Sequence, residues 1–124
     1  MVEMTFSMIA AGLLALAVGL GAFGAHGLKN RLSEYSLGIW DKAVFYHFIH
    51  ALGMLVVPLF ARANVLKPQE SGIVCWLLLA GIALFSGSLY VLALSGIGTL
   101  GAITPFGGLS FIAAWLLLAW YLSR

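Results

Sequence analysis

Three histidines, His26, His47 and His50, are the side chains in this sequence that could serve the most kinds of chemistry. An imidazole titrates near neutral pH and binds haem iron or other metal ions. His47 and His50 are three positions apart, so on a helix they share one face, which extends to Ala43 and Met54. We expect this stripe to face the interior of the protein.

Three interpretations of these histidines are open. A neutral imidazole bonded to a carbonyl, serine or tyrosine of a neighbouring helix would be structural. A chain of titrating histidines would instead be a proton path, with Tyr46 beside the stripe, four positions before His50. A haem, metal or quinone site is the third, although the chain offers no cysteine ligand beside them.

A second group of polar residues, Ser86, Ser88 and Tyr90, lies within an apolar stretch. Ser86 and Tyr90 are four apart and share a helix face. Their hydroxyl groups either bond to neighbouring helices or line a site for a small polar ligand. Further along, Thr104 precedes Pro105, a pair typical of a helix start with threonine as the N-cap.

The composition shows where these residues must lie. The 124 residues are 63% hydrophobic, only 8% are Asp, Glu, Lys or Arg, and the mean hydropathy is +1.09. A soluble domain of this size cannot bury so much apolar surface, so the chain belongs in a membrane. The net charge of +2 is scattered, which excludes a nucleic-acid partner, and Cys75 alone allows neither an intramolecular disulfide nor a cysteine zinc site.

Four uncharged stretches are long enough to cross a bilayer as helices. They cover about 6–25, 43–60, 72–94 and 106–122. The predicted fold is therefore all-α, a single integral membrane domain built as a four-helix transmembrane bundle. Between the first two spans, residues 28–40 have apolar positions at helical spacing and are expected to form an interfacial amphipathic segment.

An even number of spans places both termini on the same side of the membrane. The first and third loops then share the other side, and the candidate polar residues gather toward that end. Lysine and arginine usually mark cytoplasmic loops, but here each side carries three of them, so the count selects neither orientation.

The first span contains two rows of small residues at a spacing of four. One row is Ala11, Ala15 and Gly19, and the other is Ala17, Gly21 and Ala25. Small residues let helices approach closely in lipid, so two rows predict two neighbouring helices. We expect both neighbours to come from the same chain.

Several sequence motifs resemble those of the small membrane proteins of domain-of-unknown-function family 423. They are Gly21-Ala-Phe-Gly-Ala-His-Gly-Leu28, the stretch Ala43 to Leu52, Phe85-Ser-Gly-Ser-Leu-Tyr90, Thr104-Pro-Phe-Gly-Gly108, and Trp115. The resemblance covers nearly the whole chain and implies a four-helix protein of the cytoplasmic membrane, without implying an activity. Its recurrent positions would be Gly24, His26, Gly27, Tyr46, His50, Ser86, Gly87, Thr104, Pro105, Gly107 and Gly108.

The expected function is that of a non-enzymatic accessory or structural membrane component, because the sequence contains no nucleophile and base pair, acidic pair or phosphate loop. Its partners would be the lipid bilayer and either further copies or a larger membrane complex, with no cofactor. Two alternatives stay open. One is a small-solute or proton transporter or channel lined by His26, His50, Ser86, Tyr90 and Thr104. The other is a haem, metal or quinone binder at the end that carries the histidines.

Overall fold

A computed structural model describes residues 2–124, with side chains from Met4 onward, and these residues form helices and turns but no strand. In chain order the elements are α1 (Val2–His26), α2 (Glu34–Arg62), α3 (Pro68–Gly81), the π-helical turn η1 (Ile82–Ser86), α4 (Gly87–Ser95), the 3-10 turn η2 (Gly98–Ala102) and α5 (Thr104–Ser123). Because α3, η1 and α4 follow one another without a break, they form one long helix.

Four helices are long and apolar enough to span a bilayer. They cover Met4–His26, Glu34–Arg62, Pro68–Ser95 and Gly98–Ser123. Each contains one of the four spans expected from the sequence, and each is longer than its uncharged stretch. The predicted all-α, four-helix transmembrane architecture is confirmed.

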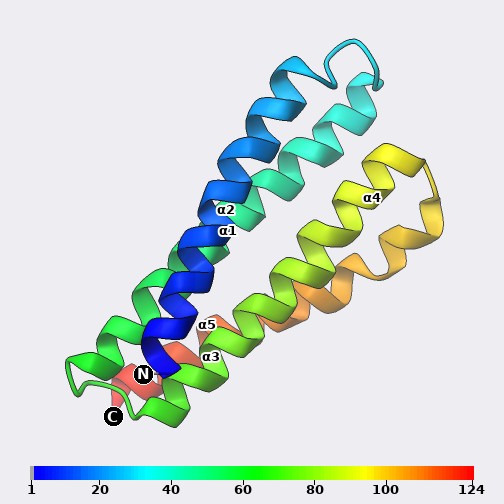
Figure 1. The fold of residues 1–124 in the computed structure, drawn as a ribbon. Helices are drawn as coiled ribbons and strands as arrows, with labels where there is room; N and C mark the ends of the chain where they lie inside the picture. Colours follow the sequence, from blue (N-terminus) through cyan, green and yellow to red (C-terminus); the bar gives the residue numbers. More distant parts are fainter. Residues whose placement is uncertain (1) are drawn as a thin grey trace.

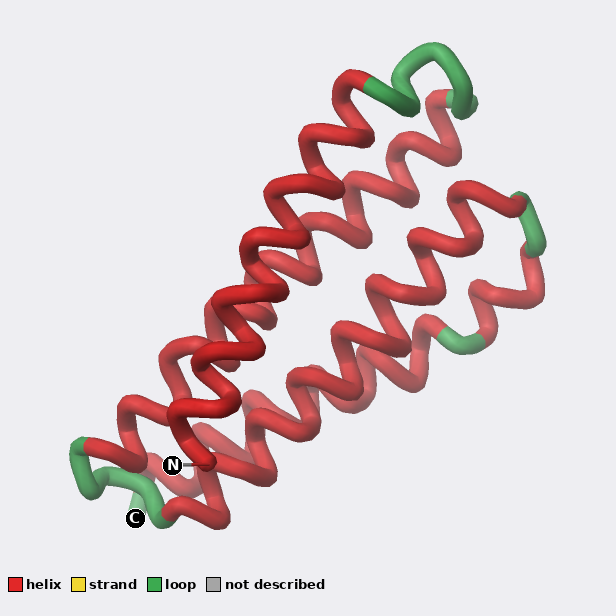
Figure 2. The backbone as a smooth tube through the Cα atoms, viewed as in Figure 1, coloured by secondary structure: helices red, strands yellow, loops and turns green. Residues whose placement is uncertain are grey.

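The helices form two antiparallel hairpins, one of α1 and α2 and the other of α3–α4 and α5 (Figure 1). Both termini and the turn at 63–67 lie at one end, which we call the terminal end. The turns at 27–33 and 96–103 lie at the opposite end, the far end (Figure 2). Helix α1 packs on α2 and, near its start, on α3, whereas α5 packs on α3 and η1. The backbones of the two hairpins diverge toward the far end (Figure 1), where side chains such as Trp40 and Tyr90 still pack between them.

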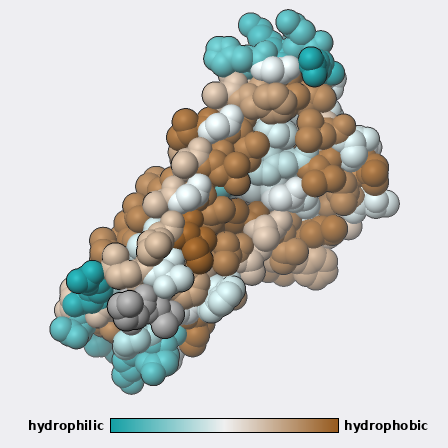
Figure 3. Space-filling view, viewed as in Figure 1, coloured by the Kyte–Doolittle hydropathy of each residue, from teal (hydrophilic) through white to brown (hydrophobic). Residues whose placement is uncertain are grey.

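The buried apolar side chains form a large cluster and a small one. The large cluster includes Met54, Val74, Leu78 and Phe111. The small cluster contains Leu28, Trp40 and Ala93, at the far end. Polar residues cover the terminal end and, at the far end, the turn at 27–33, and much of the surface between them is apolar (Figure 3), as expected of a surface that faces lipid.

Residues 28–40 do not form the separate interfacial segment expected from the sequence. Residues 28–33 form a turn in which Leu28 is buried, and residues 34–40 are the first two turns of α2. The hydroxyl oxygen of Ser33 accepts the N–H of Ser36 at 3.1 Å and caps the helix. The apolar spacing that suggested an interfacial helix therefore belongs partly to a transmembrane one.

The start of α5 also differs from the expectation. The residue before the helix is Ile103, not Thr104, and no side chain caps this end. The hydroxyl groups of Thr104 and Ser88 lie 2.7 Å apart in a hydrogen bond. Thr104 therefore joins α5 to α4 instead of capping its own helix.

Close approach of α5 to η1 depends on Gly107. A Cβ built on Gly107 would lie 2.3 Å from the backbone nitrogen of Phe85, where no side-chain motion can relieve the contact. A Cβ built on Gly24, on α1, would similarly lie 2.5 Å from the indole ring of Trp40. In lipid such contacts replace the burial from water that holds soluble helices together.

We predict that Gly107→Ala destabilises the protein by about 1–3 kcal/mol, because the new methyl group must push α5 away from η1. Gly108→Ala is the matched control, since its Cβ would meet Phe85 at an ordinary 3.8 Å. Alanine is the better helix former, so the control should be neutral or stabilising by up to about 1 kcal/mol. The free energy of unfolding in mixed detergent micelles measures both variants, and equal effects would contradict this account.

Candidate functional site

The stripe predicted to face the interior of the bundle does so. The exposed fractions are 0% for Ala43, 2% for His47, 6% for His50 and 0% for Met54. Helix α2 lies between α1 and the second hairpin, packing on α1 on one side and on α3, η1 and α4 on the other. The inward direction of the stripe is therefore confirmed, and the partners of the two histidines decide what the stripe does.

His47 joins α2 to α4. Its Nδ1 lies 2.8 Å from the hydroxyl oxygen of Tyr90. Its Nε2 makes no hydrogen bond within the described part of the chain, and the backbone of Leu13, on α1, is the neighbouring acceptor. Whether the Tyr90 hydroxyl donates to Nδ1 or accepts from it depends on which ring nitrogen carries the proton.

His50 bonds within its own helix. Its Nδ1–H donates to the carbonyl of Tyr46 at 2.7 Å, and its ring stacks on Phe111 with the centroids 3.4 Å apart. Tyr46 in turn packs against Phe85, with ring centroids 4.4 Å apart. His50 and Tyr46 thus belong to an aromatic cluster that joins α2 to η1 and α5.

Of the two roles that the sequence left open for Ser86 and Ser88, the structure shows hydrogen bonds to other helices. The Ser86 hydroxyl donates to the carbonyl of Ala43 at 2.7 Å, joining η1 to α2. The Ser88 hydroxyl is 2.9 Å from the carbonyl of Phe85 and also bonds to Thr104. The hydroxyl groups of this group are therefore engaged with protein partners.

His26 lies apart from the other histidines. It is exposed at the end of α1, where no hydrogen bond joins its side chain to the rest of the described chain. The indole N–H of Trp40 donates to the carbonyl of Leu20 at 2.9 Å, which sets the register of α1 against α2. At 1.5 Å per residue this register separates His26 from His50 by roughly 20 Å along the bundle. The structure does not bring these two histidines into one site.

Further hydrogen bonds between helices were not predicted from the sequence, where the only indication of each is a serine within an apolar stretch. The hydroxyl of Ser7 donates to the carbonyl of Leu55 at 3.2 Å, joining α1 to α2. The hydroxyl of Ser110 donates to the carbonyl of Leu77 at 2.6 Å, joining α5 to α3. The contacts of α1 with α2, of η1 with α2 and of α5 with α3 therefore each contain at least one bond from a side chain to a backbone carbonyl.

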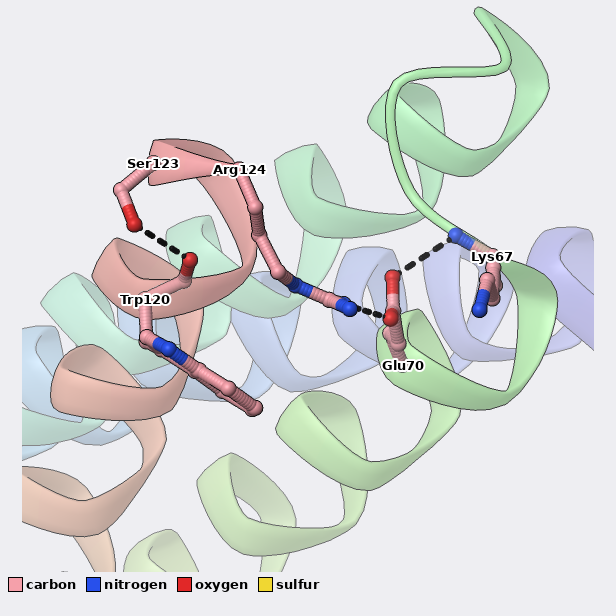
Figure 4. A network of polar contacts seen from close by, with 5 residues as sticks. All are labelled: Lys67, Glu70, Trp120, Ser123 and Arg124. Carbon is pink, nitrogen blue, oxygen red and sulfur yellow. Dashed lines mark hydrogen bonds and ion pairs between the residues drawn. The ribbon is translucent and has the colours of Figure 1, made fainter.

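Residues of the terminal end line a polar pocket of about 460 Å³, which the sequence did not predict. It is lined on its polar side by Asn64, Lys67, Glu70, Tyr121 and Arg124. The Glu70 carboxylate accepts the Lys67 backbone N–H at 3.0 Å and the Arg124 guanidinium (Figure 4). The guanidinium also lies over the ring of Trp120, 4.9 Å from its centroid.

A second hollow of about 320 Å³ opens between α2 and α5 and is lined by apolar side chains and one glycine. Its walls include Ile49, Leu52, Gly53, Val56, Phe60 and Trp115. Neither hollow is lined by a histidine. Within residues 2–124, moreover, no group of three or more His, Cys, Asp or Glu residues is placed to hold a metal ion.

Comparison with known proteins gives a consistent result. Residues 20–108 match DUF423, described as a protein of unknown function. The UPF0382 membrane protein SH2409 of Staphylococcus haemolyticus is 46% identical over 113 residues, which cover 91% of this chain and 90% of that protein. The UPF0382 membrane protein YwdK of Bacillus subtilis is 49% identical over 105 residues, 83% of each chain. No solved structure matches this chain.

The bond between His47 and Tyr90 yields a prediction. In a double-mutant cycle of His47→Phe and Tyr90→Phe, we expect a coupling of about 0.6 kcal/mol and at most about 1.7 kcal/mol, the range for hydrogen bonds within membranes. Unfolding in mixed micelles gives the four free energies. His26→Ala, at an exposed position, should change stability by less than about 0.5 kcal/mol, and a coupling indistinguishable from zero would contradict the bond.

Proposed function

This chain belongs to the DUF423 family of membrane proteins, and we propose that it serves as a non-enzymatic accessory component of the cytoplasmic membrane. In this role it docks through an exposed helix face onto a transmembrane helix of a larger membrane complex. The bacterial membrane proteins to which it is similar support the choice of membrane. The position of both termini at one end of the bundle supports termini on the same side.

The observation that carries the proposal is that polar side chains at membrane depth form hydrogen bonds with other groups of the protein. His47, Ser86 and Ser88 bond to other helices or turns, and His50 bonds to its own helix. A transport path needs polar groups that line a water-filled passage and exchange partners with the solute. Groups held by protein partners instead fix the helices against one another, which suits a rigid component without chemistry of its own.

The docking face follows from the two small-residue rows of α1. Of the row Ala17, Gly21 and Ala25, the first residue is fully buried and a Cβ on the second would meet Val44 on α2. The other row, Ala11, Ala15 and Gly19, is exposed, and nothing in the described chain lies within 4 Å of a Cβ built on Gly19. The sequence predicted a neighbour from the same chain for both rows, and this row lacks one.

Small residues at this spacing favour close packing of another helix in lipid. Gly12 lies beside the exposed row, and a Cβ built on it also meets nothing within 4 Å in the described chain. A helix of another membrane protein could therefore approach α1 as closely as α2 does on the opposite row. This is the contact that the proposed function requires.

The experiment measures the size of the assembly in mild detergent extracts of the native membrane. We expect the wild type to migrate as a complex larger than the 13.2 kDa chain. Ala15→Leu should lower the ratio of complex to free chain by about tenfold, because overpacking a close contact costs about 1–3 kcal/mol. Ala119→Leu, at an exposed position of α5, is the matched control and should leave the ratio unchanged.

Four outcomes would overturn the proposal. A chain that migrates alone would remove the accessory role, and a complex that contains only further copies would make the protein a homo-oligomer. A proton or solute flux in liposomes that His50→Ala abolishes would favour the transporter alternative. A visible absorption band that co-purifies with the wild type and disappears in His50→Ala would favour the haem alternative.

A further inference from the structure

We propose that the terminal end carries a binding site for one anionic glycerophospholipid, with an acyl chain in the apolar hollow between α2 and α5 and the headgroup phosphate in the polar pocket beside Lys67. The inference is independent of the accessory role, which rests on α1. It is argued from the shape of the hollow, its depth in the bilayer and the charge at its end.

The apolar hollow has the dimensions of a hydrocarbon chain. Its volume is about 320 Å³, and a methylene group occupies about as much space as a liquid water molecule, roughly 30 Å³, so about ten methylenes fit. Its walls run along α2 from Ile49 to Phe60, which is roughly 16 Å of helix. This length is about half of the ~30 Å hydrocarbon core, the depth of one leaflet.

The hollow is open to lipid rather than sealed by protein. Leu52 is 48% exposed, Val56 44% and Trp115 38%, whereas Val57 behind them is 1% exposed. Gly53 makes room for the indole of Trp115, since a Cβ there would lie 2.6 Å from the ring. Because the hollow faces a bilayer, a flexible acyl chain can enter it sideways from the same leaflet.

The polar pocket begins where the apolar hollow ends. Tyr121 in the pocket follows Leu118 in the hollow by three positions on α5. The carbonyl of Phe60 in the hollow accepts the backbone N–H of Val65 in the pocket at 2.8 Å. An acyl chain lying between α2 and α5 would therefore direct its headgroup toward the pocket.

The charge of the pocket suits an anion. Glu70 is its acid, and the carboxylate is engaged by Arg124 and by the Lys67 backbone N–H (Figure 4). Within the described residues, the Lys67 ammonium has no ion pair, and its side chain is exposed. The side chains that line the pocket thus include two cations, Lys67 and Arg124, and one acid, Glu70, and a headgroup phosphate would balance the excess positive charge.

The depth of the pocket matches the level of lipid phosphates. Trp76 and Trp120 are 64% and 58% exposed near this end, and tryptophan favours the boundary between headgroups and hydrocarbon. The pocket therefore lies where the phosphate of a lipid in this leaflet would be. Apolar hollow, cation and interfacial level together point to a phospholipid rather than to a free anion or an apolar molecule.

Native mass spectrometry of the full chain tests the site. The protein is released from nanodiscs of equal parts phosphatidylcholine and phosphatidylglycerol, and the bound lipids are counted. We expect one phosphatidylglycerol per chain in preference to phosphatidylcholine. Lys67→Gln should lower that preference about fivefold, the effect of one basic residue near an anionic surface. Lys42→Gln, which removes an exposed lysine near the far end, is the control and should keep the preference.

Val56→Phe tests the acyl-chain half of the site by filling the hollow from an exposed position. It should reduce retention of both lipids, whereas Val91→Phe, at a 51% exposed valine of α4, should not. Brominated phosphatidylglycerol provides a second readout on folded protein in nanodiscs. Its chain should quench wild-type tryptophan fluorescence more than brominated phosphatidylcholine does, and Trp115→Phe should remove the difference.

Four results would overturn the proposal. Equal retention of the two lipids by the wild type would remove the anionic preference. Equal loss in Lys67→Gln and Lys42→Gln would reduce it to general attraction between the protein and the leaflet. Unchanged retention in Val56→Phe would separate lipid binding from the hollow. A second protein chain retained in place of the lipid, and lost in Val56→Phe, would make the hollow a protein contact.

Discussion

The bilayer holds no water in its core, and this constraint shapes every contact between the helices of this chain. Burial from water cannot hold two transmembrane helices together, because lipid is as apolar as their side chains. Two devices replace it here. Side chains donate to carbonyls of neighbouring helices, as Ser86 does to Ala43, and glycines let backbones approach, as Gly107 does at Phe85.

Helix α2 takes part in several of these contacts. It receives the Ser86 bond from η1, contacts α4 through His47 and Tyr90, and bonds to the α1 backbone through Trp40. Histidine serves here as a hydrogen-bonding group inside the bundle, since His47 bonds to Tyr90 on α4 and His50 to the carbonyl of Tyr46 on its own helix. The same property that makes an imidazole a candidate for proton transfer makes it an effective link between helices.

The exposed surfaces follow from the same arrangement. Because α2 and α3 occupy the middle of the bundle, α1 and α5 each pack along one side and present the rest of their surface to lipid. On α1 this leaves a row of small residues without a neighbour, and between α2 and α5 it leaves a hollow. Both features lie on surfaces that the internal contacts do not need, so both are available to partners.

The sequence by itself determined the four helices, their position in a membrane and the inward direction of the Ala43 to Met54 stripe. These properties depend on length, composition and spacing along one helix, which are local and readable without knowing the neighbours. It also indicated that Ser86 and Tyr90 share a face, and both contact α2.

Only the tertiary structure decided which polar groups meet. In the structure His26 lies far from His50, and Thr104 bonds to Ser88 instead of capping its own helix. Residues 34–40 of the expected interfacial segment belong to α2. The tertiary structure also gathered Lys67, Glu70 and Arg124 around one pocket, from segments more than fifty residues apart. The partner of a side chain depends on which helix lies beside it and in what register. Glycine contacts and bonds across the bundle set that register, and no spacing within a single helix encodes it.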